Sequence, residues 1–292
     1  MTDVIIDTDV ALGVWHEGRP RDIDDGFAIV EAINSPLINL RGISCVYGNG
    51  PIDEVVRVAR EIVTLKQSNV PVARGASSKM AVDDATNEAV EFLAAELSRA
   101  PATIAAIGPL TNIGILLSRH PEVRENIDEI IIVAGRSMGA EFYIGDAGPV
   151  KDFNFENDVD ACEILMNAGV PLVLMGFELT SQVCVTHEDL ETIRRRANPT
   201  AQYFYDNSRA WCDYWIDTFP SDAGFHPWDS AAIAWVLNRS WFVSESRGHR
   251  ISRDPDRLEC SAEWDGPQHQ YCYGFSDGAG DAFVRGVIEQ VF

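Results

Sequence analysis

The chain has 292 residues, and its 45 acidic side chains outnumber its 23 lysines and arginines, which gives a formal net charge of −22. Such a charge repels nucleic acid and anionic membrane surfaces, so we expect neither as a partner. The sequence has no long apolar segment and no signal-like N-terminus, and its six cysteines form no CxxC pair. We therefore expect a cytoplasmic protein without a zinc site or a disulfide framework.

Four aspartates accompany the first two predicted elements. Asp7 and Asp9 follow the apolar strand 4–6, and Asp24 and Asp25 open an apolar-periodic segment that predicts a helix. Ligands of open α/β sheets bind where strands end, so we expect these carboxylates to converge there. Converging carboxylates repel one another unless a cation lies among them, and oxygen ligands favour Ca²⁺ or Mg²⁺. The alternative is that these residues only cap the helix and form a turn.

Strands and helices then alternate along the chain. The predicted strands span residues 40–46, 70–72, 103–107, 129–133 and 170–175. The predicted helices span residues 52–65, 86–99 and 158–167, and a further one begins near residue 110. This alternation predicts an α/β fold, an open, mostly parallel, mixed sheet with helices on both faces. We find no internal repeat or low-complexity linker, so we expect a single domain over residues 1–292.

The last third of the chain has a different pattern. Residues 190–215 are helical in pattern and rich in aromatic side chains, and an apolar helix is predicted for residues 231–236. Residues 240–273 suggest strands or a hairpin, and residues 278–291 a closing helix.

Five short motifs occur in an order that one family shares: Asp7-Thr8-Asp9 with Asp24-Asp25, Val46-Tyr47-Gly48-Asn49, Gly108-Pro109-Leu110-Thr111-Asn112, Asp152-Phe153-Asn154, and Asp229 before an apolar helix. Over roughly residues 3 to 240 the chain resembles the calcium-dependent nucleoside hydrolases, the inosine-uridine-preferring type and its relatives. The resemblance implies a Rossmann-like nucleoside hydrolase fold, a homodimer or homotetramer, and hydrolysis of a ribonucleoside to ribose and free base.

The resemblance also implies a Ca²⁺ cofactor and its ligands. Asp9 would ligate Ca²⁺ and act as general base toward a water held by the ion. Asp25 and Asp229 would be further ligands, together with the main-chain carbonyl of Ile107, and Asp7 would support this ligand shell. A carboxylate-rich site also suits the positive charge that develops on the sugar when an N-glycosidic bond breaks.

On the sugar side, the resemblance implies that Asp24 and Asn154 hold ribose hydroxyls and that Asn49 lies beside the reacting centre. Asp152 stands where the family has Glu, and Asp146 where it often has Asn; both positions face the 5′ side of the ribose. Asp is shorter than Glu by one methylene. A modified nucleoside or another N-glycoside is therefore an alternative substrate, and a non-catalytic Ca²⁺-dependent nucleoside or sugar binder is an alternative function.

On the base side, Trp228 occupies the position where many members have a His that protonates the leaving base. Purine-preferring members have Trp there, which predicts stacking and a purine preference. His226 could still serve as the acid, or it could simply precede Pro227 at a helix start. Trp211, Tyr214 and Trp215 are candidates for the base pocket and for a mobile lid, with core packing as the alternative.

Residues 10–23 form a longer loop than the family usually has, and it lies either over the rim of the site or in solvent. The run from Val4 to Asp9 also resembles the first motif of haloacid-dehalogenase-type phosphatases, in which the first Asp is the nucleophile. That chemistry needs a downstream lysine, for which Lys151 would have to serve, and no strand is predicted before Asp152. This phosphatase is a remote alternative.

Overall fold

Ten strands form one sheet in the computed structural model, which describes residues 1–81 and 86–290. In spatial order they are β5 (Val72–Arg74), β4 (Ile38–Cys45), β1 (Thr2–Thr8), β6 (Ala102–Ala106), β7 (Ile127–Val133), β9 (Leu172–Met175), β14 (Gln268–Phe275), β12 (Phe242–Arg253), β13 (Asp256–Ser261) and β8 (Arg136–Ser137). The run from β5 to β14 is parallel, and β12 is antiparallel to both of its neighbours. The predicted mixed, mostly parallel sheet is confirmed.

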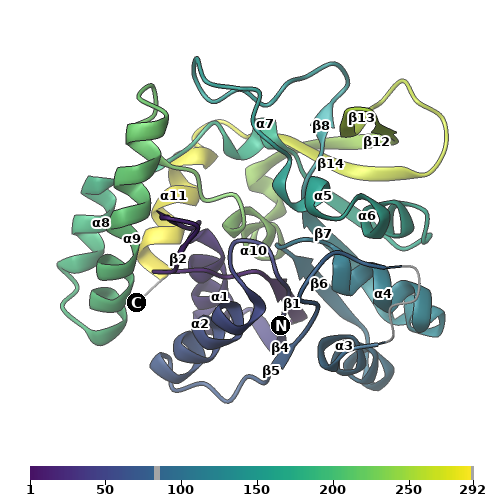
Figure 1. Cartoon of the computed structure of the whole chain (residues 1–292), viewed down its shortest axis with the longest axis horizontal. Coiled ribbons are helices and arrows are strands. Elements are labelled where there is room, and N and C mark those ends of the chain that lie inside the picture. Colours follow the sequence, from purple (N-terminus) through teal and green to yellow (C-terminus); the bar gives the residue numbers. More distant parts are fainter. Residues whose placement is uncertain (82–85, 291–292) are drawn as a thin grey trace.

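Helices cover both faces of this sheet, because alternate side chains of each strand point to opposite faces. In β1, Val4 and Ile6 belong to one buried cluster and Ile5 to the other. The first cluster includes residues of α1 (Asp24–Asn34), α2 (Ile52–Leu65), α8 (His187–Arg194), α9 (Pro199–Thr218), α10 (Ser230–Leu237) and α11 (Ala279–Gln290). The second includes residues of α3 (Glu88–Arg99), α4 (Thr111–Arg119), α5 (Phe153–Asn157) and α6 (Val159–Met166). Figure 1 shows α8 and α9 on the opposite side of the molecule from α3 and α4.

The predicted helical segment 190–215 is two helices, α8 and α9. Asn198 accepts a hydrogen bond from the Ala201 backbone N–H, and Pro199 takes the first helical position, so a new helix starts there. Asp158 likewise caps α6 through the Ala161 N–H, which separates α6 from the short α5. Other short elements are α7 (Phe177–Thr180), the paired strands β10 (Val185–Thr186) and β11 (Gly224–Phe225), and the 3₁₀ turns at Pro121–Asn126 and Arg239–Trp241.

The chain reverses its direction of travel across the sheet beside β1. After β1 it passes to β4 and β5 on one side, and it then returns to β6, β7 and β9 on the other. The Ile107 N–H donates to the Asp7 carbonyl at 2.8 Å, and the Val46 N–H donates to the Thr8 carbonyl at 2.9 Å. These bonds hold the ends of three neighbouring strands together at a topological switch point, where open α/β sheets bind their ligands.

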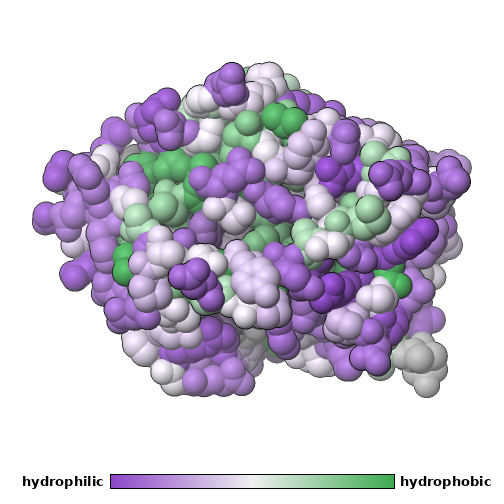
Figure 2. Space-filling model, turned by 90° about the horizontal axis from the view of Figure 1, so that it is seen from above, coloured by the Kyte–Doolittle hydropathy of each residue, from purple (hydrophilic) through white to green (hydrophobic). Residues whose placement is uncertain are grey.

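The described surface is largely polar. Figure 2 shows a mostly hydrophilic face with small hydrophobic patches between the polar residues. Large apolar side chains that are well exposed include Trp15, Leu37 and Tyr143. No helix within residues 1–81 and 86–290 combines the length and apolarity needed to cross a membrane.

Glu31 of α1 is buried at 1% exposure, and its Oε2 has no hydrogen-bond partner among the described residues. Burial raises the pKa of this carboxyl to about 8, so between about pH 4.5 and 8 the folded chain holds a proton that the unfolded chain releases. Folding stability contributed by this group therefore falls as pH rises through that window. We expect Glu31→Gln to stabilise the fold at about pH 9 by up to about 5 kcal/mol and to do little at about pH 4.

Thermal or urea unfolding of both proteins at the two pH values measures this effect. Glu125→Gln is the matched control, because Glu125 is exposed. A Glu31→Gln protein with the same advantage at both pH values would show that packing, and not ionisation, is responsible.

Candidate metal and substrate site

A cavity of about 630 Å³ lies where the parallel strands end. This volume falls within the range of small-molecule sites. Its lining comes from the segments that follow β1, β4, β6, β7 and β9, from residues 151–154, from α9, and from Trp228 and Asp229. The sheet edge predicted to hold the site is therefore where the cavity lies.

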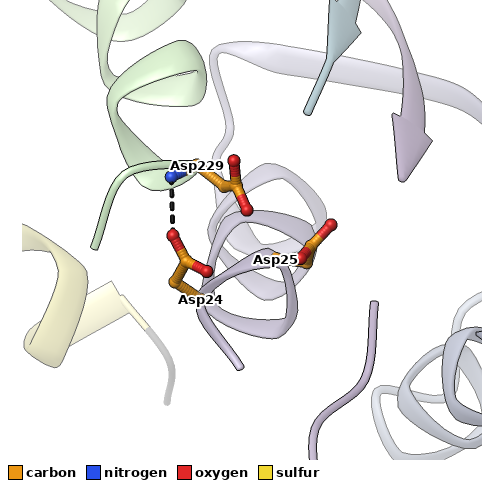
Figure 3. Close-up of side chains that lie close together, drawn as sticks. All are labelled: Asp24, Asp25 and Asp229. Carbon is orange, nitrogen blue, oxygen red and sulfur yellow. Dashed lines mark hydrogen bonds between the residues drawn. The ribbon is translucent and has the colours of Figure 1, made fainter. Parts of the chain in front are cut away.

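Three buried aspartates converge beside this cavity (Figure 3). Asp24 and Asp25 extend from the first turn of α1, and Asp229 precedes α10. One carboxylate oxygen from each lies within 4.8 Å of the others. The Asp229 backbone N–H donates to Asp24 Oδ2 at 2.8 Å, and the Thr8 hydroxyl donates to Asp25 Oδ1. Asp25 Oδ2 has no hydrogen-bond partner within the described part of the chain.

Burial and mutual repulsion make these carboxylates hard to ionise. Burial, followed by the charge of Asp24, raises the pKa of Asp25 to about 7. The pKa of Asp229 is raised well above its ordinary value, by burial and then by the charges of Asp24 and Asp25. A divalent cation would reverse these shifts, because it favours the ionised form. An all-oxygen donor set with an unsatisfied buried carboxylate oxygen fits a hard cation such as Ca²⁺ or Mg²⁺.

Asp9 lies at the end of β1, next to the aspartate cluster, and lines the cavity. Its Oδ2 accepts a hydrogen bond from the Asn49 backbone N–H at 2.6 Å. Burial, followed by the charge of Asp25, raises the pKa of Asp9. The loop at Gly48 approaches so closely that an added Cβ would lie 2.0 Å from Asp9 Oδ2, so only glycine fits there. The carboxylate is thus held in one position facing the cavity.

Asp7 lies beneath the cavity and does not line it. Its Oδ1 accepts hydrogen bonds from the Ser44 hydroxyl at 2.5 Å and from Asn112 Nδ2 at 2.8 Å. Burial raises its pKa to about 7, against the effect of these two bonds. Asn112 also donates to the Cys45 carbonyl and accepts from the Ala76 N–H, each at 3.0 Å. Asp7 therefore joins β1, β4 and α4, which places it in a supporting position.

The sugar-side residues named from the sequence divide into two groups. Asp24, Asn49, Asp152 and Asn154 line the cavity, together with Ile107, whereas Asp146 is exposed and lies outside the lining. Asn154 Nδ2 donates to the Ile107 carbonyl at 3.2 Å and to the Val133 carbonyl at 3.1 Å. Asp152 Oδ2 accepts from the Gly135 N–H at 2.8 Å, and burial raises its pKa to about 7.

An aromatic wall faces the aspartates from α9 and from the segment before α10. Trp211, Tyr214, Trp215 and Trp228 line the cavity, and the rings of Trp215 and Trp228 meet edge to face with centroids 5.2 Å apart. Trp211 and Trp215 are only 5% and 6% exposed, so they are core residues that also border the cavity.

His226 is buried outside the cavity lining. Its Nδ1 lies 2.6 Å from the Val183 carbonyl oxygen, and its Nε2 lies 3.0 Å from Asp222 Oδ2. The structure therefore does not bring its ring nitrogens to the base side of the cavity.

The long loop 10–23 borders the cavity through its second half. It contains a small hairpin, β2 (Trp15–His16) paired with β3 (Arg19–Pro20). The loop residues that line the cavity are His16, Glu17, Arg19, Arg21 and Asp22. Of the two positions considered for residues 10–23, the rim of the site and solvent, the structure shows the rim. None of these five side chains was among the predicted site residues, since nothing in the local sequence indicates which way the loop folds.

A second unpredicted wall of the cavity is apolar. Phe142 and Phe177 stack with ring centroids 3.9 Å apart, and Ile144, Val150 and Met175 lie in the same lining. These residues come from the loop 142–150, the end of β9 and the start of α7, with no shared sequence pattern.

Comparisons of this chain with a family model, with related sequences and with solved structures all lead to nucleoside hydrolases. The family described as inosine-uridine preferring nucleoside hydrolase matches residues 4–271. A pyrimidine-specific ribonucleoside hydrolase, RihA, from Shewanella woodyi is 31% identical over 249 residues, which cover 76% of this chain and 78% of that relative. A solved purine-preferring ribonucleoside hydrolase from Gardnerella vaginalis has a TM-score of 0.84 at 21% identity, covering 99% of this chain and 98% of that chain. A plant nucleoside hydrolase has a TM-score of 0.83 at 20% identity, with coverage of 99% and 98%.

Proposed function

Since the chain belongs to the inosine-uridine preferring nucleoside hydrolase family and is accordingly an N-ribohydrolase, we propose that it uses Ca²⁺ and an aspartate base and that it favours purine nucleosides. The observation that carries this proposal is the buried cluster of Asp24, Asp25 and Asp229 beside Asp9, at the end of a cavity large enough for a nucleoside. The reaction joins water to C1′ and releases ribose and the free base.

Asp25 and Asp229, with Asp9 and the Ile107 carbonyl, would hold the cation. The chemistry that Ca²⁺ supplies when bound is a positive charge that orients water and makes it more acidic. Asp24 also belongs to the acidic cluster, and its Oδ2 already accepts the Asp229 N–H. We assign Asp24, with Asn154, to the ribose diol.

Asp9 would remove the proton from the attacking water. The Asn49 N–H at 2.6 Å fixes one oxygen of Asp9, which leaves the other free to accept a proton. As the C1′–N bond lengthens, positive charge develops on the ribose ring, and the surrounding carboxylates stabilise it electrostatically. A free nucleoside, and not nucleic acid, is the substrate we propose, because the chain carries a net charge of −22.

A panel of nucleosides tests this assignment. Release of free base and reducing sugar from inosine, guanosine, uridine and cytidine is expected, with the purine nucleosides turned over fastest. Binding of these nucleosides without any hydrolysis would favour the non-catalytic binder. Hydrolysis restricted to 5′-modified ribosides would favour the modified substrate, which the short Asp152 side chain and the exposed Asp146 keep open.

Trp228 supports the purine preference, whereas the RihA relatives are named as pyrimidine-specific. Stacking of a base on an aromatic side chain contributes on the order of 1–3 kcal/mol, and a purine offers the larger face. We expect Trp228→Ala to lower kcat/KM for inosine about tenfold or more and to lower that for uridine less. Steady-state kinetics on both substrates measures the ratio. Trp241→Ala is the control, because Trp241 lies outside the cavity lining. An unchanged ratio in Trp228→Ala would remove the basis for purine preference.

A further inference from the structure

Arg21 is a buried cation in the wall of the cavity. It is 5% exposed and lies among the residues that line the cavity. Its Nη2 donates to Glu17 Oε2 at 2.5 Å, and its Nε has no acceptor within residues 1–81 and 86–290. Glu17 is largely exposed, with 71% of its side chain accessible, so solvent screens that ion pair. The charge of Arg21 is therefore incompletely neutralised within the protein.

The loop that carries Arg21 is docked against α9. Glu17 and Gly18, with φ of 53° and 77°, form the tight turn between β2 and β3, and the Arg21 N–H donates to the Val14 carbonyl at 3.0 Å. An added Cβ at Gly13 would lie 2.2 Å from Asn207 Oδ1 on α9.

A second contact fixes the loop on the aromatic wall. Arg19 Nη1 lies 3.3 Å from the Tyr214 hydroxyl, and its guanidinium carbon lies 5.6 Å from the Tyr214 ring centroid. Arg19 thus borders the cavity beside Tyr214 of the aromatic wall, and Arg21, two residues later in the loop, lines the same cavity as the tryptophans proposed to hold the base.

Cleavage of the N-glycosidic bond leaves the bonding electron pair on the base. The leaving base therefore carries negative charge unless a group protonates it, and a nearby cation can stabilise that charge. Trp228 replaces the usual acid, and an indole N–H does not give up its proton near neutral pH. Both nitrogens of His226 already face oxygen acceptors, outside the lining. Among the described lining residues, Arg19, Arg21 and Lys151 are positively charged, and His16 is the other basic side chain.

We propose that Arg21, assisted by Arg19, stabilises the negative charge on the leaving base and so takes the place of a proton donor. This inference rests on the proposed function. In the step, the water oxygen bonds to C1′, the C1′–N bond breaks with its electron pair on the base, and the water proton passes to Asp9. After release, the base anion takes a proton from solvent and Asp9 returns its proton to solvent. A fixed cation in a desolvated wall stabilises such charge better than solvent does.

The test compares two leaving groups in the same protein. Inosine and uridine release a basic anion, whereas p-nitrophenyl β-D-ribofuranoside releases a stable phenolate that needs no such assistance. We expect Arg21→Gln to lower kcat for the nucleosides about 100-fold, which is the scale of losing one preorganised electrostatic contact. The kcat for the p-nitrophenyl riboside should stay within about threefold of the native value. Guanidinium added to Arg21→Ala should restore part of the nucleoside activity, as Arg21→Lys should retain part of it.

Three outcomes separate the possibilities. Equal losses on both kinds of substrate, without rescue by guanidinium, would overturn the role of Arg21 and show that it supports the loop. A p-nitrophenyl riboside rate near that of the native enzyme shows that the variant is folded. If the native enzyme hydrolyses neither substrate, the proposed function itself is overturned, and the inference with it. Arg57→Gln is the matched control, because Arg57 pairs with Glu54 and Glu61 on the exposed face of α2.

Discussion

Asp9→Ala is expected to lower kcat for the best nucleoside at least about a thousandfold and to leave the fold intact. Losing a general base alone lowers rates by about 10²–10⁴, and Asp9 is also proposed to ligate the cation. The fold should tolerate the change, because Asp9 is a buried carboxylate whose raised pKa shows that ionising it in the folded chain is unfavourable. Initial rates, circular dichroism and thermal unfolding measure both parts of this prediction.

Asp9→Asn keeps the shape of the side chain and removes its ability to act as a base. The amide oxygen can still accept the Asn49 N–H, but it cannot take a proton from water, so kcat should fall to a similar extent with little change in KM. Asp128→Ala is the control, because Asp128 is exposed near the start of β7, at the opposite end of that strand from the cavity. Normal turnover by Asp9→Ala would rule out this aspartate as the base.

Signals confined to a short stretch of sequence predicted the fold well. The apolar spacing after Pro51 placed α2 at residues 52–65, as observed. Asp7 and Asp9 were placed at the end of β1, and α1 begins at Asp24, as expected. The break between α8 and α9 was missed although Asn198 and Pro199 are local signals, because the helical pattern on both sides suggested one helix.

Contacts between distant residues account for what the sequence did not predict. The Asp229 N–H bonds Asp24 across 205 positions, and Arg19 meets Tyr214 across 195. A motif identifies which residues belong to a site, but it does not fix the orientation of a loop. Asp146 and Asp152 therefore separated, one exposed and the other in the cavity, although both were expected on the sugar side.

The same limit applies to His226. Its position two residues before Trp228 suggested an acid at the base, yet its ring is directed to the Val183 carbonyl and to Asp222. Side-chain direction before a helix depends on the neighbouring packing. Trp215 and Trp228 both contact the ring of His226, and these two residues, not the histidine, line the cavity.

A chelator is expected to abolish turnover and to lower the melting temperature, and added Ca²⁺ should restore both. Four carboxylates, those of Asp9, Asp24, Asp25 and Asp229, are buried together, and their raised pKa values reflect the energy needed to ionise them without a cation. A cation that binds only the folded chain at a hundred times its dissociation constant adds about 2.7 kcal/mol of stability. Rates and melting curves with chelator, Ca²⁺ and Mg²⁺ measure this and show which ion is used.

The effect of a chelator on stability should depend on pH, and the raised pKa of Asp25 gives the direction of that dependence. The pKa of Asp25 rises from 3.8 to about 7 on folding, so without a cation this group contributes stability that is lost as pH rises through that window. Ca²⁺ competes with the proton, so its affinity, and the loss of stability caused by a chelator, should grow from about pH 5 to about pH 8. Asp25→Asn should weaken Ca²⁺ binding and flatten this dependence, whereas Asp128→Asn should change neither. Turnover and melting that are insensitive to chelator at about pH 8 would contradict a metal site at these aspartates, because the repulsion among them would then be relieved by protons alone.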